Sequence, residues 1–190
     1  MRTRVFALGA AAALALSGCS LVGGDDTGSD ASSSSSSTSS GVVNGDASTN
    51  GAKEAGIDLD NPPKPMAEAT IKINQNSIDE TKMELLELRR SDNVMLATFR
   101  LTGTGRGTEV QSAFRLLGMT SFDPTFIDMK RLEKYQHVGQ LTSNMVQAKA
   151  PLGEPVYVFT AFPLPKDGVS ELDLRMTSDS PSIEAIPMPK

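Results

Sequence analysis

The chain has 190 residues, a formal net charge of −5, one cysteine and one histidine. A single cysteine excludes an internal disulfide, so a folded domain in this chain must be held together by packing. Residues 67–190 carry 16 acidic and 14 basic side chains. This near balance disfavours nucleic acid as a partner, since phosphates require a clustered positive face.

The amino-terminal region has the layout of an export signal. Two arginines precede an apolar run over residues 5–16, which is shorter than the roughly 20 residues that a membrane-spanning helix needs. The run ends in the sequence Leu16-Ser17-Gly18-Cys19. This sequence resembles a bacterial lipobox. The resemblance implies that the Cys19 thiol receives diacylglycerol, that the signal peptide is cut just before this cysteine, and that the new amino terminus is acylated, for example with palmitate.

The next segment has the composition of a disordered tether. Residues 20–56 are rich in serine, glycine, threonine, aspartate and alanine, with an unbroken serine run at residues 32–37. Aromatic side chains are missing and apolar ones are scarce, so burial cannot offset the entropy lost on ordering. The prolines of residues 61–65 favour an extended entry into a domain. We therefore expect a signal peptide over residues 1–18 and a lipidated cysteine with a disordered tether over residues 19–66.

Residues 67–190 have the pattern of short strands separated by turns. Two apolar runs, at residues 83–90 and 94–102, flank the polar turn of residues 91–93, which predicts a hairpin. The strong helix formers of residues 78–89 follow a capping-box pattern and favour a helix on propensity alone. We expect a strand there, because the run that follows the turn needs an antiparallel partner.

Further strands are expected at residues 69–74, 110–117, 134–138, 155–162, 170–176 and 182–186. The run at residues 155–162 is apolar on both faces, which predicts an interior strand, whereas residues 170–176 alternate and residues 182–186 form a short edge. A flexible loop is expected at residues 103–107 and an irregular passage at residues 123–129. Seven to nine short strands predict an all-β fold, an antiparallel immunoglobulin-like β-sandwich.

Several short motifs of this region are shared with a known group of proteins. They are Leu88-Arg89-Arg90, Phe99-Arg100-Leu101-Thr102, Ile127-Asp128, Lys134-Tyr135, Leu141-Thr142-Ser143, and Gly153-Glu154-Pro155 with the strand that follows. In these motifs the chain resembles actinobacterial lipoproteins that carry one immunoglobulin-like sandwich behind a low-complexity tether. The resemblance implies a cell-envelope protein and supplies no catalytic residue. Relatives often have a cysteine where this chain has Leu141.

The residues that could carry chemistry are few. His137 is a conceivable general base or metal ligand, but the chain has no Gly-x-Ser-x-Gly elbow, and a lone histidine is more often structural. The methionines suit Cu(I), yet they are scattered, and core filling explains them better. The pairs Arg89-Arg90 and Lys130-Arg131 could meet an acidic partner, although charge more commonly protects strand edges. We expect no enzyme activity, no catalytic or metal-binding residue, and no cofactor.

The function expected from these features is that of an interaction module. The protein would be lipid-anchored on the extracytoplasmic face of the cell membrane, and its sandwich would bind another envelope or secretion-system protein through an edge or an end loop. The alternative is a carrier that holds a small apolar ligand or a metal between the sheets, with no binding residue assigned. A tight core with an exposed apolar patch favours the module, and a large apolar cavity favours the carrier.

Overall fold

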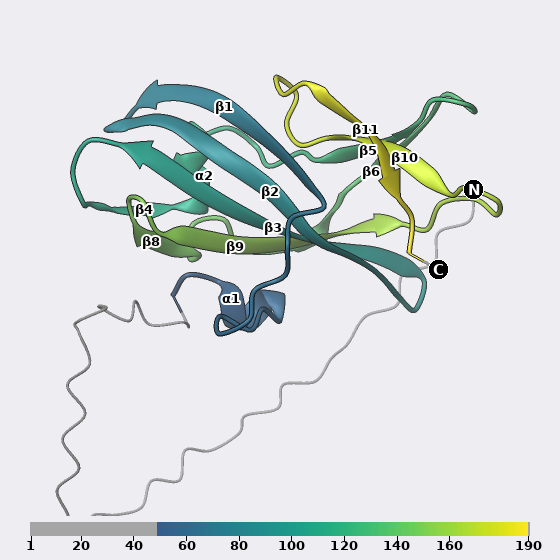
Figure 1. Cartoon of the computed structure of the whole chain (residues 1–190), viewed down its shortest axis with the longest axis horizontal. Coiled ribbons are helices and arrows are strands. Elements are labelled where there is room, and N and C mark those ends of the chain that lie inside the picture. Colours follow the sequence, from purple (N-terminus) through teal and green to yellow (C-terminus); the bar gives the residue numbers. More distant parts are fainter. Residues whose placement is uncertain (1–48, 190) are drawn as a thin grey trace, which may run out of the picture. The chain divides into compact units, whose positions relative to one another are not determined.

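Eleven strands and two short helices form the part of the chain that the computed structural model describes, residues 49–189 (Figure 1). The helices are α1 (Ala52–Ala55) and α2 (Ala113–Leu116). The strands are β1 (Ala67–Gln75), β2 (Ile78–Ser91), β3 (Val94–Gly105), β4 (Val110–Ser112), β5 (Thr125–Asp128), β6 (Glu133–Gln136), β7 (Val138–Thr142), β8 (Lys149–Pro151), β9 (Pro155–Pro163), β10 (Glu171–Arg175) and β11 (Ser182–Pro187). The predicted signal peptide and its motif Leu16-Ser17-Gly18-Cys19 lie outside the described residues.

The strands pair antiparallel in two main sheets. The larger sheet has the order β1-β2-β3-β9-β7 and the smaller one the order β11-β10-β5-β6, while β4 and β8 form a separate two-stranded ribbon (Figure 1). The predicted all-β sandwich is confirmed. As expected, β9 lies in the interior of its sheet and β11 lies at an edge.

One apolar core joins the two sheets. The ring of Phe126 on β5 meets that of Phe162 on β9 edge to face, with centroids 4.8 Å apart. In the same core the ring of Phe99 on β3 meets that of Phe122 at 5.3 Å. Such aromatic pairs contribute about 0.5–1.5 kcal/mol beyond the burial of their area. The alternation predicted for β10 is confirmed, because Leu172, Leu174 and Met176 are all buried.

The segment with helix-forming residues is strand β2, as predicted. Ser77, where the capping-box pattern begins, forms with Asn76 the two-residue turn between β1 and β2, and both residues have a positive φ, as a type I′ turn requires. β2 pairs with β3 along its length. A register shift between Leu85 and Glu87 marks a β-bulge, and the intervening Leu86 belongs to a second, smaller apolar cluster. Pairing with β3 therefore overrides the local propensity.

The single strand predicted over residues 110–117 is wrong. β4 ends at Ser112, whose hydroxyl accepts a hydrogen bond from the Arg115 N–H at 3.3 Å and so caps the short helix α2. The irregular passage predicted over residues 123–129 is also wrong, since these residues contain β5. With four residues, β5 is too short to show an alternating pattern of its own.

The flexible loop predicted at residues 103–107 is in part the end of strand β3, which continues to Gly105. A Cβ at Gly103 would lie 2.5 Å from the Leu116 side chain, and a Cβ at Gly105 would lie 2.0 Å from the carbonyl oxygen of Ser77. The two glycines are therefore required by close packing rather than by flexibility.

The predicted tether includes a folded element at residues 49–57, which we call the N-terminal clip. Its apolar side chains lie against the outer face of the larger sheet, in a cluster made of Ala52, Ala55, Ile57, Leu86 and Tyr157, with Phe159 packed beside it. The Asn50 carbonyl accepts a hydrogen bond from the Tyr157 N–H at 2.8 Å. The disordered-tether prediction is therefore wrong for these residues, and the described fold begins before residue 67.

Candidate interaction surface

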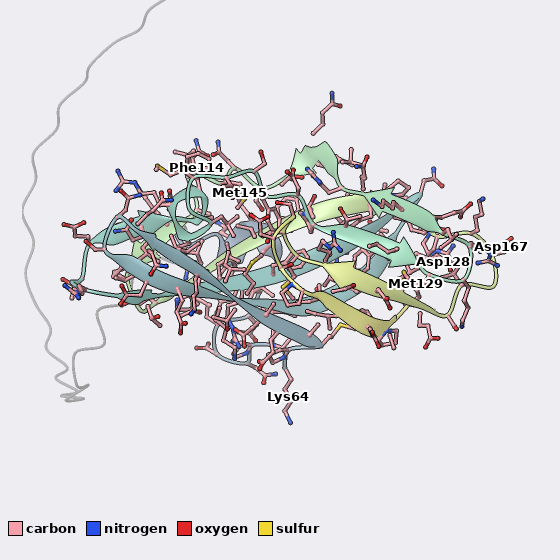
Figure 2. The ribbon with its side chains drawn as sticks, turned by 90° about the horizontal axis from the view of Figure 1, so that it is seen from above. Lys64, Phe114, Asp128, Met129, Met145 and Asp167 are labelled. Carbon is pink, nitrogen blue, oxygen red and sulfur yellow. The ribbon has the colours of Figure 1, made fainter. Side chains whose placement is uncertain are left out.

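A rigid turn with two exposed apolar side chains connects β5 to β6. We call its four residues, Met129, Lys130, Arg131 and Leu132, the turn site. Met129 is 60% exposed and Leu132 is 82% exposed, the highest value among the exposed large apolar residues of the described part of the chain. Figure 2 shows Met129 beside Asp128 and close to Asp167 of the β9–β10 loop. Two exposed apolar side chains on one ordered turn make it a candidate contact surface.

Asp128, the last residue of β5, holds this turn in place. Its carboxylate is buried, and Oδ1 accepts hydrogen bonds from the N–H groups of Lys130 at 2.9 Å and Arg131 at 3.0 Å. Oδ2 pairs with Nη1 of Arg131 at 3.1 Å, while Nη2 of Arg131 donates to the Asp167 carbonyl at 3.2 Å. The turn is thus fixed both to its own strand and to the neighbouring loop.

The electrostatic state of Asp128 follows from these contacts. Burial alone raises the pKa of the carboxyl group, because it disfavours the charged form. The hydrogen bonds from the backbone and side chain of Arg131 and from the backbone of Lys130 outweigh this effect and lower the pKa below its ordinary value of 3.8. Asp128 is therefore ionised at neutral pH, and its charge is compensated locally by Arg131.

The basic residues around the turn are paired with carboxylates of the same chain. Nζ of Lys130 lies 3.1 Å from Glu171 Oε1, and Lys166 pairs with Glu133. Lys130 and Arg131 were considered above as contacts for an acidic partner. In the structure they already pair with Glu171 and Asp128 of the same chain. The part of the turn site that has no contact of this kind is its apolar surface, formed by Met129 and Leu132.

Open hollows flank the turn site on two sides. One has a volume of about 390 Å³ and is lined by Ile127, Met129 and Asp173, among others. Another, of about 150 Å³, lies between Arg131 and the β9–β10 loop at Val169. The turn site is therefore a protruding apolar turn beside hollows of mixed polarity.

A second apolar patch is formed by α2, the residues that follow it, and the β7–β8 loop. Phe114 is 36% exposed, Met119 49% and Val146 64%. The Phe114 N–H donates to the Met145 carbonyl at 2.8 Å, and the Met119 N–H donates to the Phe114 carbonyl at 2.9 Å. Figure 2 shows Phe114 and Met145 near each other and away from the turn site. This patch is a second exposed apolar surface of the described residues.

The residues considered for chemistry are not brought together. His137 lies between β6 and β7, and its Nε2 is 3.9 Å from Oδ1 of the exposed Asp123. Within residues 49–189 no group of three or more histidine, cysteine, aspartate or glutamate side chains is placed to hold a metal ion. Met83, Met95 and Met176 are fully buried in the core, whereas Met119 and Met129 are exposed in different places.

The apolar part of the turn site was missed at the sequence level. Lys130-Arg131 was noticed as a charge pair, but Met129 was treated as the end of an irregular passage and no role was predicted for Leu132. An aspartate side chain that accepts hydrogen bonds from the backbone N–H groups that follow it is a common turn former. Asp128, followed by four residues that lead into a new strand, was therefore the sequence feature that could have predicted this turn.

The fold and this surface together define a class: an antiparallel β-sandwich that presents a rigid, apolar-tipped turn. No protein-family model, curated protein or solved structure matches the chain. In the described residues, neither helix has the length or the apolar character to span a membrane.

Proposed function

We propose that this chain is a lipid-anchored protein on the extracytoplasmic face of the cell membrane, and that its sandwich binds an envelope or secretion-system protein without catalysing a reaction. The lipobox-like sequence that ends in Cys19 supports the anchor. The resemblance to actinobacterial envelope lipoproteins supports the location. The binding role rests on one observation, the turn site.

The turn site offers apolar surface that a partner can bury. Burial of an exposed Met or Leu side chain contributes about 1.5–3 kcal/mol, so Met129 and Leu132 are a source of binding free energy that the isolated domain leaves unused. Because Asp128 already orders the turn, little conformational entropy is lost when a partner binds. The core itself is filled by aromatic rings between the sheets, which favours a surface function over a carrier function.

The binding role can be tested by site-specific cross-linking in intact producing cells. A photoreactive amino acid at Leu132 should capture one dominant protein, identified by mass spectrometry. The matched control places the same group at Val110, which is 54% exposed and lies on the β4–β8 ribbon. Equal capture of the same proteins at both positions would overturn the proposal and favour the carrier alternative, for which native mass spectrometry would detect a retained ligand.

The anchor has a separate test. Cys19→Ala removes the thiol that would carry the diacylglycerol, so the protein should be released into the medium or accumulate with its signal peptide attached. Cell fractionation followed by mass measurement distinguishes these forms. A processed Cys19→Ala protein that stays in the membrane fraction would refute the lipid anchor and leave the binding role of the turn site untouched.

A further inference from the structure

Strand β1 leaves a long free edge on the larger sheet. It pairs with β2 on one side only and forms the margin of the sheet (Figure 1). Its pairing with β2 is regular from Ala67 to Lys72. The other edge strands of the two sheets are shorter, and β11 is interrupted by a register shift. β1 is therefore the edge best suited to accept another strand.

The charges on this edge are arranged symmetrically about Thr70. Glu68 and Lys72 point to the solvent face, two residues before and two residues after Thr70. If a second β1 strand pairs antiparallel about a two-fold axis at Thr70, Glu68 of each copy lies opposite Lys72 of the other. Opposite charges in directly facing positions stabilise a strand pair, and like charges destabilise it.

Both side chains can take part in such a pair. Glu68 is 60% exposed and contacts Nζ of Lys82 at 2.9 Å through one carboxylate oxygen, which leaves the other oxygen available. Lys72 is exposed and forms no ion pair within residues 49–189.

The inner face of β1 has a matching arrangement of sizes. Within the regular part of β1, the same two-fold axis places Ala69 opposite Ile71 of the second copy, so that a small side chain faces a large one. Ile71 and Ile73 pack against the core but are only partly buried. Beside them lies an open hollow of about 200 Å³, whose other side is formed by Gly118 and by Thr177 and Ser178 of the β10–β11 loop. A second strand would cover the exposed parts of both isoleucines.

We propose that two copies of this chain associate through antiparallel pairing of their β1 strands about a two-fold axis at Thr70. The two five-stranded sheets then form one continuous sheet, and the interface is isologous. The turn site is not part of this interface, so each dimer presents two copies of it. A partner with two binding sites would bind such a dimer more tightly than it binds a monomer.

The charge arrangement provides the decisive test. The experiment is sedimentation equilibrium of the full chain carrying Cys19→Ser. With the native β1 sequence, this chain should show a monomer–dimer equilibrium. Glu68→Lys or Lys72→Glu alone places like charges opposite each other at two symmetric positions and should weaken dimerisation about 10-fold or more. The double variant restores both pairs and should restore the dimer.

Thermal unfolding of each variant verifies that the monomer is folded. A chain that remains monomeric at all concentrations would overturn the proposal, as would a double variant that dimerises no better than the folded single variants.

An independent test uses the position of the axis. In the same Cys19→Ser background, Thr70→Cys should form an intermolecular disulfide on mild oxidation, because directly opposed residues of antiparallel strands lie about 4.5–5.5 Å apart between their Cα atoms. Gln75→Cys lies far from the axis in the same strand and is the control. Non-reducing electrophoresis reads out both, and equal cross-linking of the two variants would contradict this register.

Discussion

At the scale of single residues, Asp128 and Gln111 show opposite ways of burying a polar group. Asp128 is 4% exposed and has hydrogen-bond or ionic partners for both carboxylate oxygens. Gln111 on β4 is 1% exposed, and neither its Nε2 nor its Oε1 has a hydrogen-bond partner within the described part of the chain. The first arrangement stabilises the fold and the second destabilises it. Each leads to a measurable prediction.

For Asp128 we predict a stability contribution that depends on pH. The pKa of Asp128 is lower in the folded chain than its ordinary value of 3.8. The ionised carboxylate therefore stabilises the fold fully at pH values above 3.8, and this stabilisation is lost as the pH falls through the folded-state pKa. Asp128→Asn should therefore lower the free energy of unfolding at pH 7 more than at pH 3. Urea denaturation at both pH values gives the two differences.

The control for this prediction is Asp167→Asn, because Arg131 bonds the backbone carbonyl of Asp167 and not its side chain. This variant should unfold like the wild type at both pH values. If Asp128→Asn lowered stability equally at pH 3 and pH 7, the ionised carboxylate would have no special role in holding the turn.

For Gln111 we predict a gain of stability on replacement by an apolar side chain. Gln111→Leu removes a buried amide without partners and should raise the free energy of unfolding by about 1–2 kcal/mol, as determined by urea denaturation. A loss of stability would show instead that the amide holds a buried water molecule, which leucine cannot bind.

At the scale of elements, sequence reasoning succeeded for β2, whose partner strand follows it in the chain, and failed for the N-terminal clip, whose partners are remote. β2 was assigned as a strand against its helix propensity because the turn and the run that follow it required a partner. The N-terminal clip was missed because it has only three buried apolar residues in a polar stretch. Its support comes from Leu86, displaced by a bulge, and from Tyr157 of β9, and neither position can be inferred from the local pattern.

The same limit applies to the turn site. The type of turn could be read from Asp128 and the residues after it, whereas the exposure of Leu132 depends on how β5 and β6 sit in the smaller sheet. A sequence pattern predicts which face of a strand or helix is apolar. Whether a given side chain is exposed to solvent depends on the neighbouring elements that pack against it in the fold.

The clip is held by a glycine that no other residue can replace without cost. Gly51 has φ +83°, and a Cβ at this position would lie 2.1 Å from the Tyr157 carbonyl oxygen. We predict that Gly51→Ala detaches the clip while the sandwich stays folded. Hydrogen exchange of the amides in residues 52–57 should then be fast, with the amides of β3 still protected.

Gly56→Ala is the matched control for Gly51→Ala. Gly56 also has a positive φ, +71°, but a Cβ there would have no atom within 4 Å. This variant should cost about 1–2 kcal/mol through backbone strain alone and keep the clip in place. Equal protection of the clip in both variants would mean that the close approach of Gly51 to Tyr157 is not what holds it.

At the scale of the whole molecule, the two main sheets share one core and should unfold together. Phe126 and Phe162 are fully buried and bring β5 of the smaller sheet into contact with β9 of the larger one. Phe126→Ala should lower the free energy of unfolding by about 3–5 kcal/mol. The loss should appear as one cooperative transition when followed by hydrogen exchange in β3 and in β10.

Val110→Ala, on the exposed side of the ribbon, is the control for this core substitution and should change stability little. If β10 lost its protection in Phe126→Ala while β3 kept its own, the two sheets would be separate cooperative units.

The place where the clip is attached also determines how the domain responds to tension. The carbonyl groups of Thr49 and Asn50 accept hydrogen bonds from the N–H groups of Lys149 and Tyr157, respectively. A pulling force applied at Thr49 acts on these two hydrogen bonds first and only afterwards on the ladder between β1 and β2. The clip therefore yields before the sheet. Its release frees a segment that spans at most about 30 Å when extended and leaves the sandwich and its turn site intact, so the domain can yield to tension at this end without unfolding.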